Sequence, residues 1–120
     1  MHTILVADDS FDNRYIIGQM LQANGYRIVY AKNGREALES IAAERPALVF
    51  MDLSMPEIDG WTATAAIRAD AELATLPVIA VTGHVTMEEI QRAHQAGCTD
   101  VLTKPFEYDE LISKVRALLK

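Results

Sequence analysis

Residues 47–61 read ALVFMDLSMPEIDGW, and this stretch joins a strand-like apolar run to an isolated carboxylate. Residues 47–51 are continuously apolar, as expected for a strand that is buried on both faces of a parallel sheet. Asp52 follows the run directly. Because a carboxylate at the end of a buried strand costs free energy unless a partner compensates it, the stretch predicts a polar site at that end of the strand.

Strand-like and helix-like segments alternate on both sides of this stretch. Short apolar or alternating runs predict further strands over residues 3–7, 26–31, 77–82 and 100–103. Apolar residues at helical spacing predict helices over residues 12–24, 33–44, 60–70, 86–97 and 106–119. Five strand–helix units imply an α/β fold, in which helices cover both faces of a parallel sheet. Only residues 26–31 show the pattern of a half-buried strand, so we expect that strand at an edge of the sheet.

The composition is that of one globular domain, which we expect to occupy residues 1–120. Half of the 120 residues are hydrophobic and 23% are charged, which is enough for a single core. No apolar stretch approaches the roughly 20 residues that span a membrane. The first residues lead into a strand without a signal sequence, which favours a cytoplasmic protein. Cys98 is the only cysteine, so an internal disulfide is excluded, and we expect it to be a small buried hydrophobe.

The charge balance bears on possible partners. The chain has 11 basic and 17 acidic residues, a formal net charge of −6. Proteins that bind nucleic acid neutralise rows of phosphates with clustered lysines and arginines. No such cluster is found in this sequence, so we expect neither nucleic acid nor a membrane among its partners.

Five polar residues lie at or just after the ends of predicted strands: Asp8, Asp9, Asp52, Thr82 and Lys104. Each alone has an ordinary interpretation, because an aspartate after a strand is commonly a turn or cap residue. In a parallel sheet, however, the carboxyl ends of the strands share one edge, and ligands of open α/β sheets bind beyond that edge. We therefore expect these side chains to converge on a single cleft.

Three carboxylates in one cleft restrict the chemistry. At about 4 Å and an effective dielectric constant of about 20, each pair of carboxylates repels by ~4 kcal/mol. A hard divalent cation relieves this repulsion, and Mg²⁺, which binds through one or two carboxylates and water, suits the set. A carboxylate can also act as a nucleophile that forms an aspartyl phosphate. A lysine and a hydroxyl then supply the positioning and charge that phosphoryl transfer requires.

The motifs at these strand ends resemble those of response regulator receiver domains, of the stand-alone chemotaxis type. They are DD after the first strand, MDLSMPEIDG, VIAVTG and TKPF. The resemblance implies a flavodoxin-like, doubly wound fold with strand order 2-1-3-4-5 and a cis Lys104–Pro105 bond. It also implies that Asp52 is the phosphoacceptor, Thr82 the hydroxyl that responds to phosphorylation, and Lys104 the phosphate-pairing amine.

The resemblance further implies a Mg²⁺ site. Asp9 matches a direct metal ligand, and Asp8 matches the acid that holds metal-bound water. Asp52 and the carbonyl of Ser54 match the remaining protein ligands. The implied phosphoryl donor is a sensor histidine kinase or a histidine phosphotransfer protein. The implied output is phosphorylation-dependent binding to an effector protein. A homodimer linked to phosphorylation is a further expectation. In many receivers, an aromatic residue three positions before the lysine changes its side-chain conformation on phosphorylation. This chain has Val101 at that position.

Two other functions fit parts of the pattern. A pseudo-receiver, which binds partners without being phosphorylated, has the same fold, but the intact acid triad, Thr82 and Lys104 favour the phosphoacceptor. A phosphatase with an aspartate nucleophile needs a second acid two residues after the nucleophile to protonate the leaving group. Ser54 occupies that position, so we expect a signalling protein rather than an enzyme, with only limited self-phosphorylation and autodephosphorylation.

Overall fold

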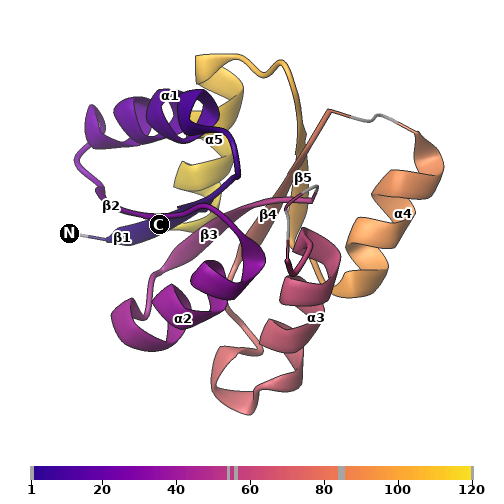
Figure 1. The fold of residues 1–120 in the computed structure, drawn as a ribbon. Helices are drawn as coiled ribbons and strands as arrows, with labels where there is room; N and C mark the ends of the chain where they lie inside the picture. Colours follow the sequence, from indigo (N-terminus) through magenta and orange to yellow (C-terminus); the bar gives the residue numbers. More distant parts are fainter. Residues whose placement is uncertain (1, 54, 56, 84–85, 120) are drawn as a thin grey trace.

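The computed structural model describes residues 2–53, 55, 57–83 and 86–119. Five parallel strands form one sheet in the order β2-β1-β3-β4-β5, shown in Figure 1. This confirms the predicted α/β fold, the strand order and the edge position of the second strand. The strands are β1 (Thr3–Ala7), β2 (Arg27–Ala31), β3 (Leu48–Asp52), β4 (Val78–Thr82) and β5 (Asp100–Thr103).

The five predicted helices are present, with bounds that differ from prediction by up to two residues. They are α1 (Phe11–Gln22), α2 (Gly34–Glu44), α3 (Gly60–Ala69), α4 (Met87–Ala96) and α5 (Tyr108–Leu118). The first four start at a capping side chain that accepts a backbone N–H of the first turn; the caps are Ser10, Asn33, Asp59 and Thr86. One element was not predicted, the short 3₁₀ helix η1 (Ala71–Leu73). None of the described helices is long and apolar enough to cross a membrane.

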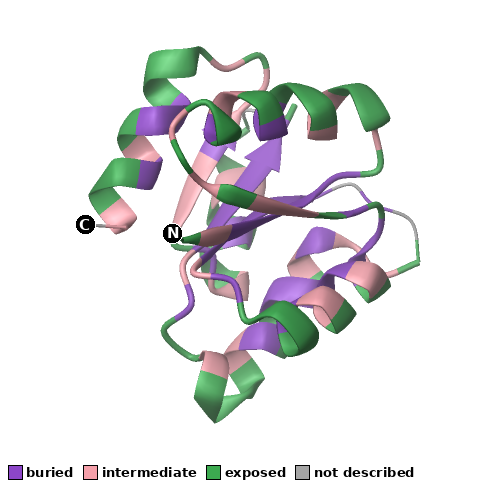
Figure 2. Cartoon of the chain, turned by 90° about the vertical axis from the view of Figure 1, so that its left-hand side faces the viewer, coloured by how far each residue is buried: buried purple, intermediate pink, exposed green. Residues whose placement is uncertain are grey.

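The helices cover both faces of the sheet (Figure 1). Helices α1 and α5 lie on one face, and α2, α3 and α4 lie on the other. Figure 2 shows that the central strands are buried while the outer helix surfaces are exposed. Every residue of β3 and β4 is buried, whereas β2 is only partly buried. The continuous apolar runs of the central strands therefore reflect burial on both faces.

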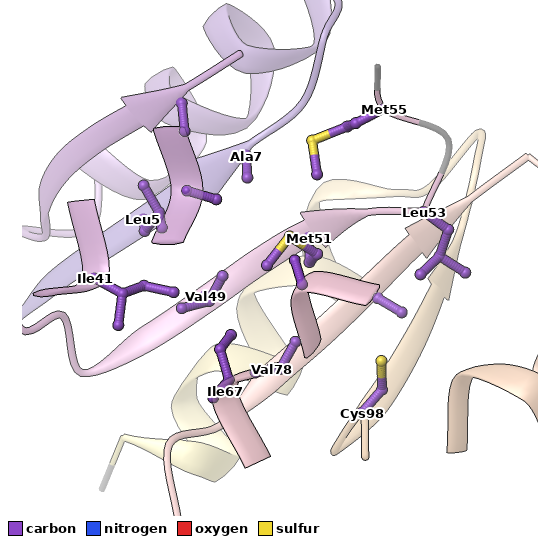
Figure 3. Packing of buried hydrophobic residues seen from close by; sticks show 14 of the residues in the cluster. Leu5, Ala7, Ile41, Val49, Met51, Leu53, Met55, Ile67, Val78 and Cys98 are labelled. Atoms are coloured by element: carbon purple, nitrogen blue, oxygen red, sulfur yellow. The ribbon is translucent and has the colours of Figure 1, made fainter. Parts of the chain in front are cut away.

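The core on the α2–α4 face holds the end of β3 in place. Figure 3 shows Val49 and Met51 of β3 among side chains of neighbouring strands and of the helices that cover them, including Ile41 and Ile67. Cys98 belongs to the same cluster, and burial raises the pKa of its thiol. This confirms that Cys98 is a buried hydrophobe. A strand packed in this way gives Asp52, its last residue, a fixed position.

The strand register aligns the polar residues at the carboxyl edge of the sheet. Ala7 of β1 lies opposite Met51 of β3, so the next residues, Asp8 and Asp52, leave neighbouring strands at the same level. Thr82 of β4 pairs in register with Thr103 of β5, directly before Lys104. The bond between Lys104 and Pro105 is cis, as the family resemblance implied. The four strands β1, β3, β4 and β5 thus deliver their terminal residues to one edge.

Candidate functional site

Three carboxylates meet at the carboxyl edge of the sheet. Each of Asp8, Asp9 and Asp52 offers a carboxylate oxygen, and these oxygens lie within 4.8 Å of one another. The side chains of Asp8 and Asp52 are 2% and 7% exposed, whereas Asp9 is exposed to solvent. The site is therefore a cluster of two buried acids and one acid at the rim.

Lys104 reaches this cluster from the end of β5. Its Nζ atom lies 3.2 Å from Oδ2 of Asp8 and 3.8 Å from Oδ1 of Asp52. The lysine side chain is 26% exposed, so both ion pairs are mostly shielded from water. Such pairs are screened much less by salt than surface pairs are. Lys104 is thus a cationic partner of both buried carboxylates within the structure.

Thr82 completes the set from the end of β4. It is buried, with 4% of its surface exposed. Its carbonyl oxygen accepts a hydrogen bond of 2.7 Å from the backbone N–H of Lys104. This bond fixes the backbone of Lys104, which follows β5, relative to the end of β4. All five residues predicted for the site are therefore brought to one edge of the sheet. Ser54, whose carbonyl was a further predicted metal ligand, lies outside the described residues.

A close backbone approach holds the loop that follows Asp52. The N–H of Gly60 donates to the carbonyl of Leu53 at 3.2 Å. A Cβ atom at Gly60 would overlap the carbonyl oxygen of Asp52 and would lie 2.7 Å from the Cα atom of Leu53. Only glycine at position 60 lets the first turn of α3 lie this close to the end of β3, where Asp52 is located. The loop therefore leaves Asp52 and returns beside it within eight residues.

Two hydrogen bonds at the site were not predicted from the sequence. The Nη1 atom of Arg14 donates to the carbonyl oxygen of Asp8 at 2.6 Å, and the carboxylate of Asp8 accepts the N–H of Ser10 at 2.9 Å. Both bonds fix the turn that presents Asp8 and Asp9. In the sequence Arg14 is one of two charged residues at the start of a predicted helix, a pattern that is typical of solvated side chains, so nothing distinguished it.

The donor set fits a hard divalent cation. Mg²⁺ prefers carboxylate oxygens and water, and is usually held by one or two carboxylates rather than by a complete protein cage. The three converging carboxylates offer such ligands, and the exposure of Asp9 leaves room for water on that side. No other group of at least three potential metal-binding side chains is found among the described residues.

Comparison with known proteins places the chain in a family. The model of the response regulator receiver domain matches residues 4–116. The chain therefore belongs to the response regulator receiver domain family, whose members act in two-component signalling.

Individual relatives are similar over nearly all of this chain. The response regulator MprA of Mycolicibacterium vanbaalenii is 38% identical over 98% of this chain and 50% of its own length. The polar-differentiation response regulator DivK of Brucella anthropi is 31% identical over 98% of this chain and 95% of its own length. The chain thus spans about half of the MprA-type relatives it matches and nearly all of DivK.

A solved structure shows the same fold. The receiver domain of a sensor histidine kinase from Pseudomonas aeruginosa PAO1, with a magnesium ion coordinated in its active site cleft, is 32% identical. It matches with a TM-score of 0.91 over 98% of this chain and 96% of that domain.

Proposed function

We propose that this receiver domain accepts a phosphoryl group on Asp52 from a phosphohistidine of a sensor histidine kinase or a histidine phosphotransfer protein. The observation that supports this most directly is the convergence of Asp52 with Asp8, Asp9 and Lys104 at one edge of the sheet. A carboxylate at the end of a rigid buried strand is a well-positioned nucleophile, and positioning supplies a large part of the rate of such reactions.

The transfer is a displacement at phosphorus. A carboxylate oxygen of Asp52 forms the new bond to phosphorus while the phosphorus–nitrogen bond of the donor breaks, and the leaving imidazole takes up a proton from water. Lys104 moves from the acid cluster to pair with an oxygen of the transferred group, and the Thr82 hydroxyl donates to another. Asp9, Asp52 and the Ser54 carbonyl would hold Mg²⁺ directly, and Asp8 would hold it through bound water; the ion would supply positive charge that reduces repulsion between the carboxylates and the anionic group.

The phosphorylated domain then signals through protein binding. We propose that it binds an effector in its phosphorylated form and that homodimerisation accompanies this change. We also propose that residues 1–120 act as a single receiver domain, which is supported by the match to nearly the whole length of DivK. The domain itself supplies only limited self-phosphorylation from small donors and limited autodephosphorylation.

An intact-mass experiment tests the phosphoacceptor assignment. The purified chain is incubated with acetyl phosphate, with and without Mg²⁺, and its mass is followed over time. We expect a gain of one phosphoryl group that requires Mg²⁺. No gain under any condition would favour the phosphorylation-independent binding module. Continuous phosphate release without an accumulated adduct would favour a phosphatase.

A further inference from the structure

The start of α2 lies against the loop that follows Asp52. A Cβ atom at Gly34, the first residue of α2, would overlap the carbonyl oxygen of Ile58 and would lie 2.7 Å from its carbonyl carbon and 2.8 Å from its Cβ atom. Contacts below 3.0 Å are essentially never made by real Cβ atoms. The loop residue Ile58 therefore occupies space that any side chain at position 34 would need.

This contact cannot relax easily, because backbone atoms make it and a cap holds the helix start. The atoms in the way belong mainly to the backbone of Ile58 rather than to the end of a flexible side chain. On the helix side, the Asn33 side chain accepts the N–H of Glu36 at 2.8 Å, and the Glu36 carboxylate accepts the N–H of Lys32 at 3.1 Å. This reciprocal cap holds the first turn of α2 in place.

The segment that leads into α2 contacts the turn that carries Asp8 and Asp9. The N–H of Asp8 donates to the carbonyl of Ala31 at 3.0 Å, three residues before Gly34. A side-chain contact reinforces the link to the Asp52 loop, since Nε of Arg35 lies 3.6 Å from a carboxylate oxygen of Glu57. Glu57 has a left-handed backbone with φ of 65°, a conformation that non-glycine residues seldom adopt. The end of β2 and the start of α2 therefore contact both segments that carry the acid cluster.

We infer that Gly34 is a positioning residue for the acid cluster: its missing side chain lets Ile58 settle against α2. The bond from the Gly60 N–H to the Leu53 carbonyl then passes this position on to the end of β3, where Asp52 lies. The inference rests on the function proposed above. Gly34 touches neither metal nor phosphoryl donor, so it acts only through the loop. A displacement of about 1 Å at such a site can cost on the order of a hundredfold in rate.

The test compares two glycine-to-alanine variants that lie in helices. Gly34→Ala forces the loop to move. Gly18→Ala in α1 is the matched control, because its Cβ would meet the ring of Tyr30, a half-exposed side chain that can turn outward. For wild type and both variants, the dissociation constant for Mg²⁺ alone is taken from backbone amide shifts, and the rate of phosphorylation by acetyl phosphate is measured at saturating Mg²⁺.

We expect Gly34→Ala to weaken Mg²⁺ binding and to slow phosphorylation, each by about tenfold to a hundredfold. Gly18→Ala should keep both values within about twofold of wild type. A variant that is less stable but still folded would retain wild-type Mg²⁺ affinity, so these readouts separate positioning from stability. If folded Gly34→Ala has the Mg²⁺ affinity and phosphorylation rate of wild type, the inference is overturned. If the wild-type protein itself neither binds Mg²⁺ nor gains a phosphoryl group, the proposed function is overturned instead.

A second variant applies if Gly34→Ala does not fold, as judged by circular dichroism. Arg35→Met removes the ion pairs with Glu57 and Glu39 without touching the backbone. All three side chains are more than half exposed, so folding should persist. We expect phosphorylation to slow by about twofold to fivefold, in line with the modest strength of exposed pairs. Arg27→Met, which removes the exposed pair with Glu44, is its control. Equal rates for the two variants would overturn the inference.

Discussion

Replacing Lys104 with methionine tests its role as the internal counter-ion of the acid cluster. In wild type, its Nζ atom lies 3.2 Å from Asp8 and 3.8 Å from Asp52. Lys104→Met keeps the apolar stem of the side chain but leaves the buried Asp8 carboxylate without this partner. Removing one member of a buried pair costs about 3–5 kcal/mol. Because Lys104 is 26% exposed, we expect a loss of ~3 kcal/mol in the free energy of unfolding.

The loss should depend on Mg²⁺. A ligand that binds only the folded protein stabilises it, by about 2.7 kcal/mol at one hundred times its dissociation constant. With Mg²⁺ bound as proposed, part of this gain would be offset in wild type, because the cation and its water would compete with Lys104 for Asp8. The variant lacks that competition, so its stability deficit should shrink by at least ~1 kcal/mol at saturating Mg²⁺.

Urea unfolding with EDTA and with saturating Mg²⁺ measures both quantities. Lys114→Met is the matched control, since Lys114 is 23% exposed and pairs with Asp100 at 2.9 Å, outside the acid cluster. The loss in free energy of unfolding caused by Lys114→Met should be the same with and without Mg²⁺. If the deficit of Lys104→Met is also independent of Mg²⁺, Lys104 and the cation do not share the site and the reasoning fails.

Three further predictions address other parts of the chain. Asp9→Ala should weaken Mg²⁺ binding more than Asp8→Ala, as followed by the fluorescence of Trp61; equal binding by Asp9→Ala and wild type would remove the metal assignment. Burial raises the pKa of the Cys98 thiol, so wild-type stability should fall as the pH rises above about 8.5, the ordinary pKa of a thiol, because only the unfolded thiol ionises there. In Cys98→Ala, the free energy of unfolding measured with urea should fall less over that pH range. The same dependence on pH in wild type and Cys98→Ala would contradict the assignment. Val101→Ala should leave phosphorylation-dependent partner binding largely intact, because a stiff β-branched side chain cannot act as an aromatic switch; loss of that dependence in a pull-down would show that the switch runs through Val101.

Much of the fold could be predicted because local signals and burial agree. The apolar run before Asp52 required a strand buried on both faces, and β3 is buried along its whole length. The helix predicted from residue 86 starts at Met87 in the structure, directly after the capping Thr86. The strand order did not follow from these patterns, since parallel strands with similar apolar runs can be arranged in several ways. It came from the family resemblance.

The sequence predicted that the candidate residues converge, but it did not predict their contacts with one another and with their surroundings. The convergence of Asp8, Asp52 and Lys104 follows from strand ends that share an edge. The sequence did not reveal the hydrogen bond from Arg14 to the carbonyl of Asp8. Nor did it reveal that Gly34 makes room for Ile58, because close approach of two backbones depends on tertiary packing and leaves no local pattern.

The location of the phosphoryl group tests the central claim most directly. Wild type and Asp52→Asn are treated with acetyl phosphate and Mg²⁺, reduced with borohydride, which converts an aspartyl phosphate to homoserine, and mapped by peptide mass spectrometry. The amide of Asp52→Asn is nearly isosteric but a poor nucleophile, so the variant should fold and gain no phosphoryl group. We predict homoserine at position 52 in wild type alone. A modification at any other residue, or an equal mass gain in Asp52→Asn, would contradict the assignment of Asp52 as the phosphoacceptor.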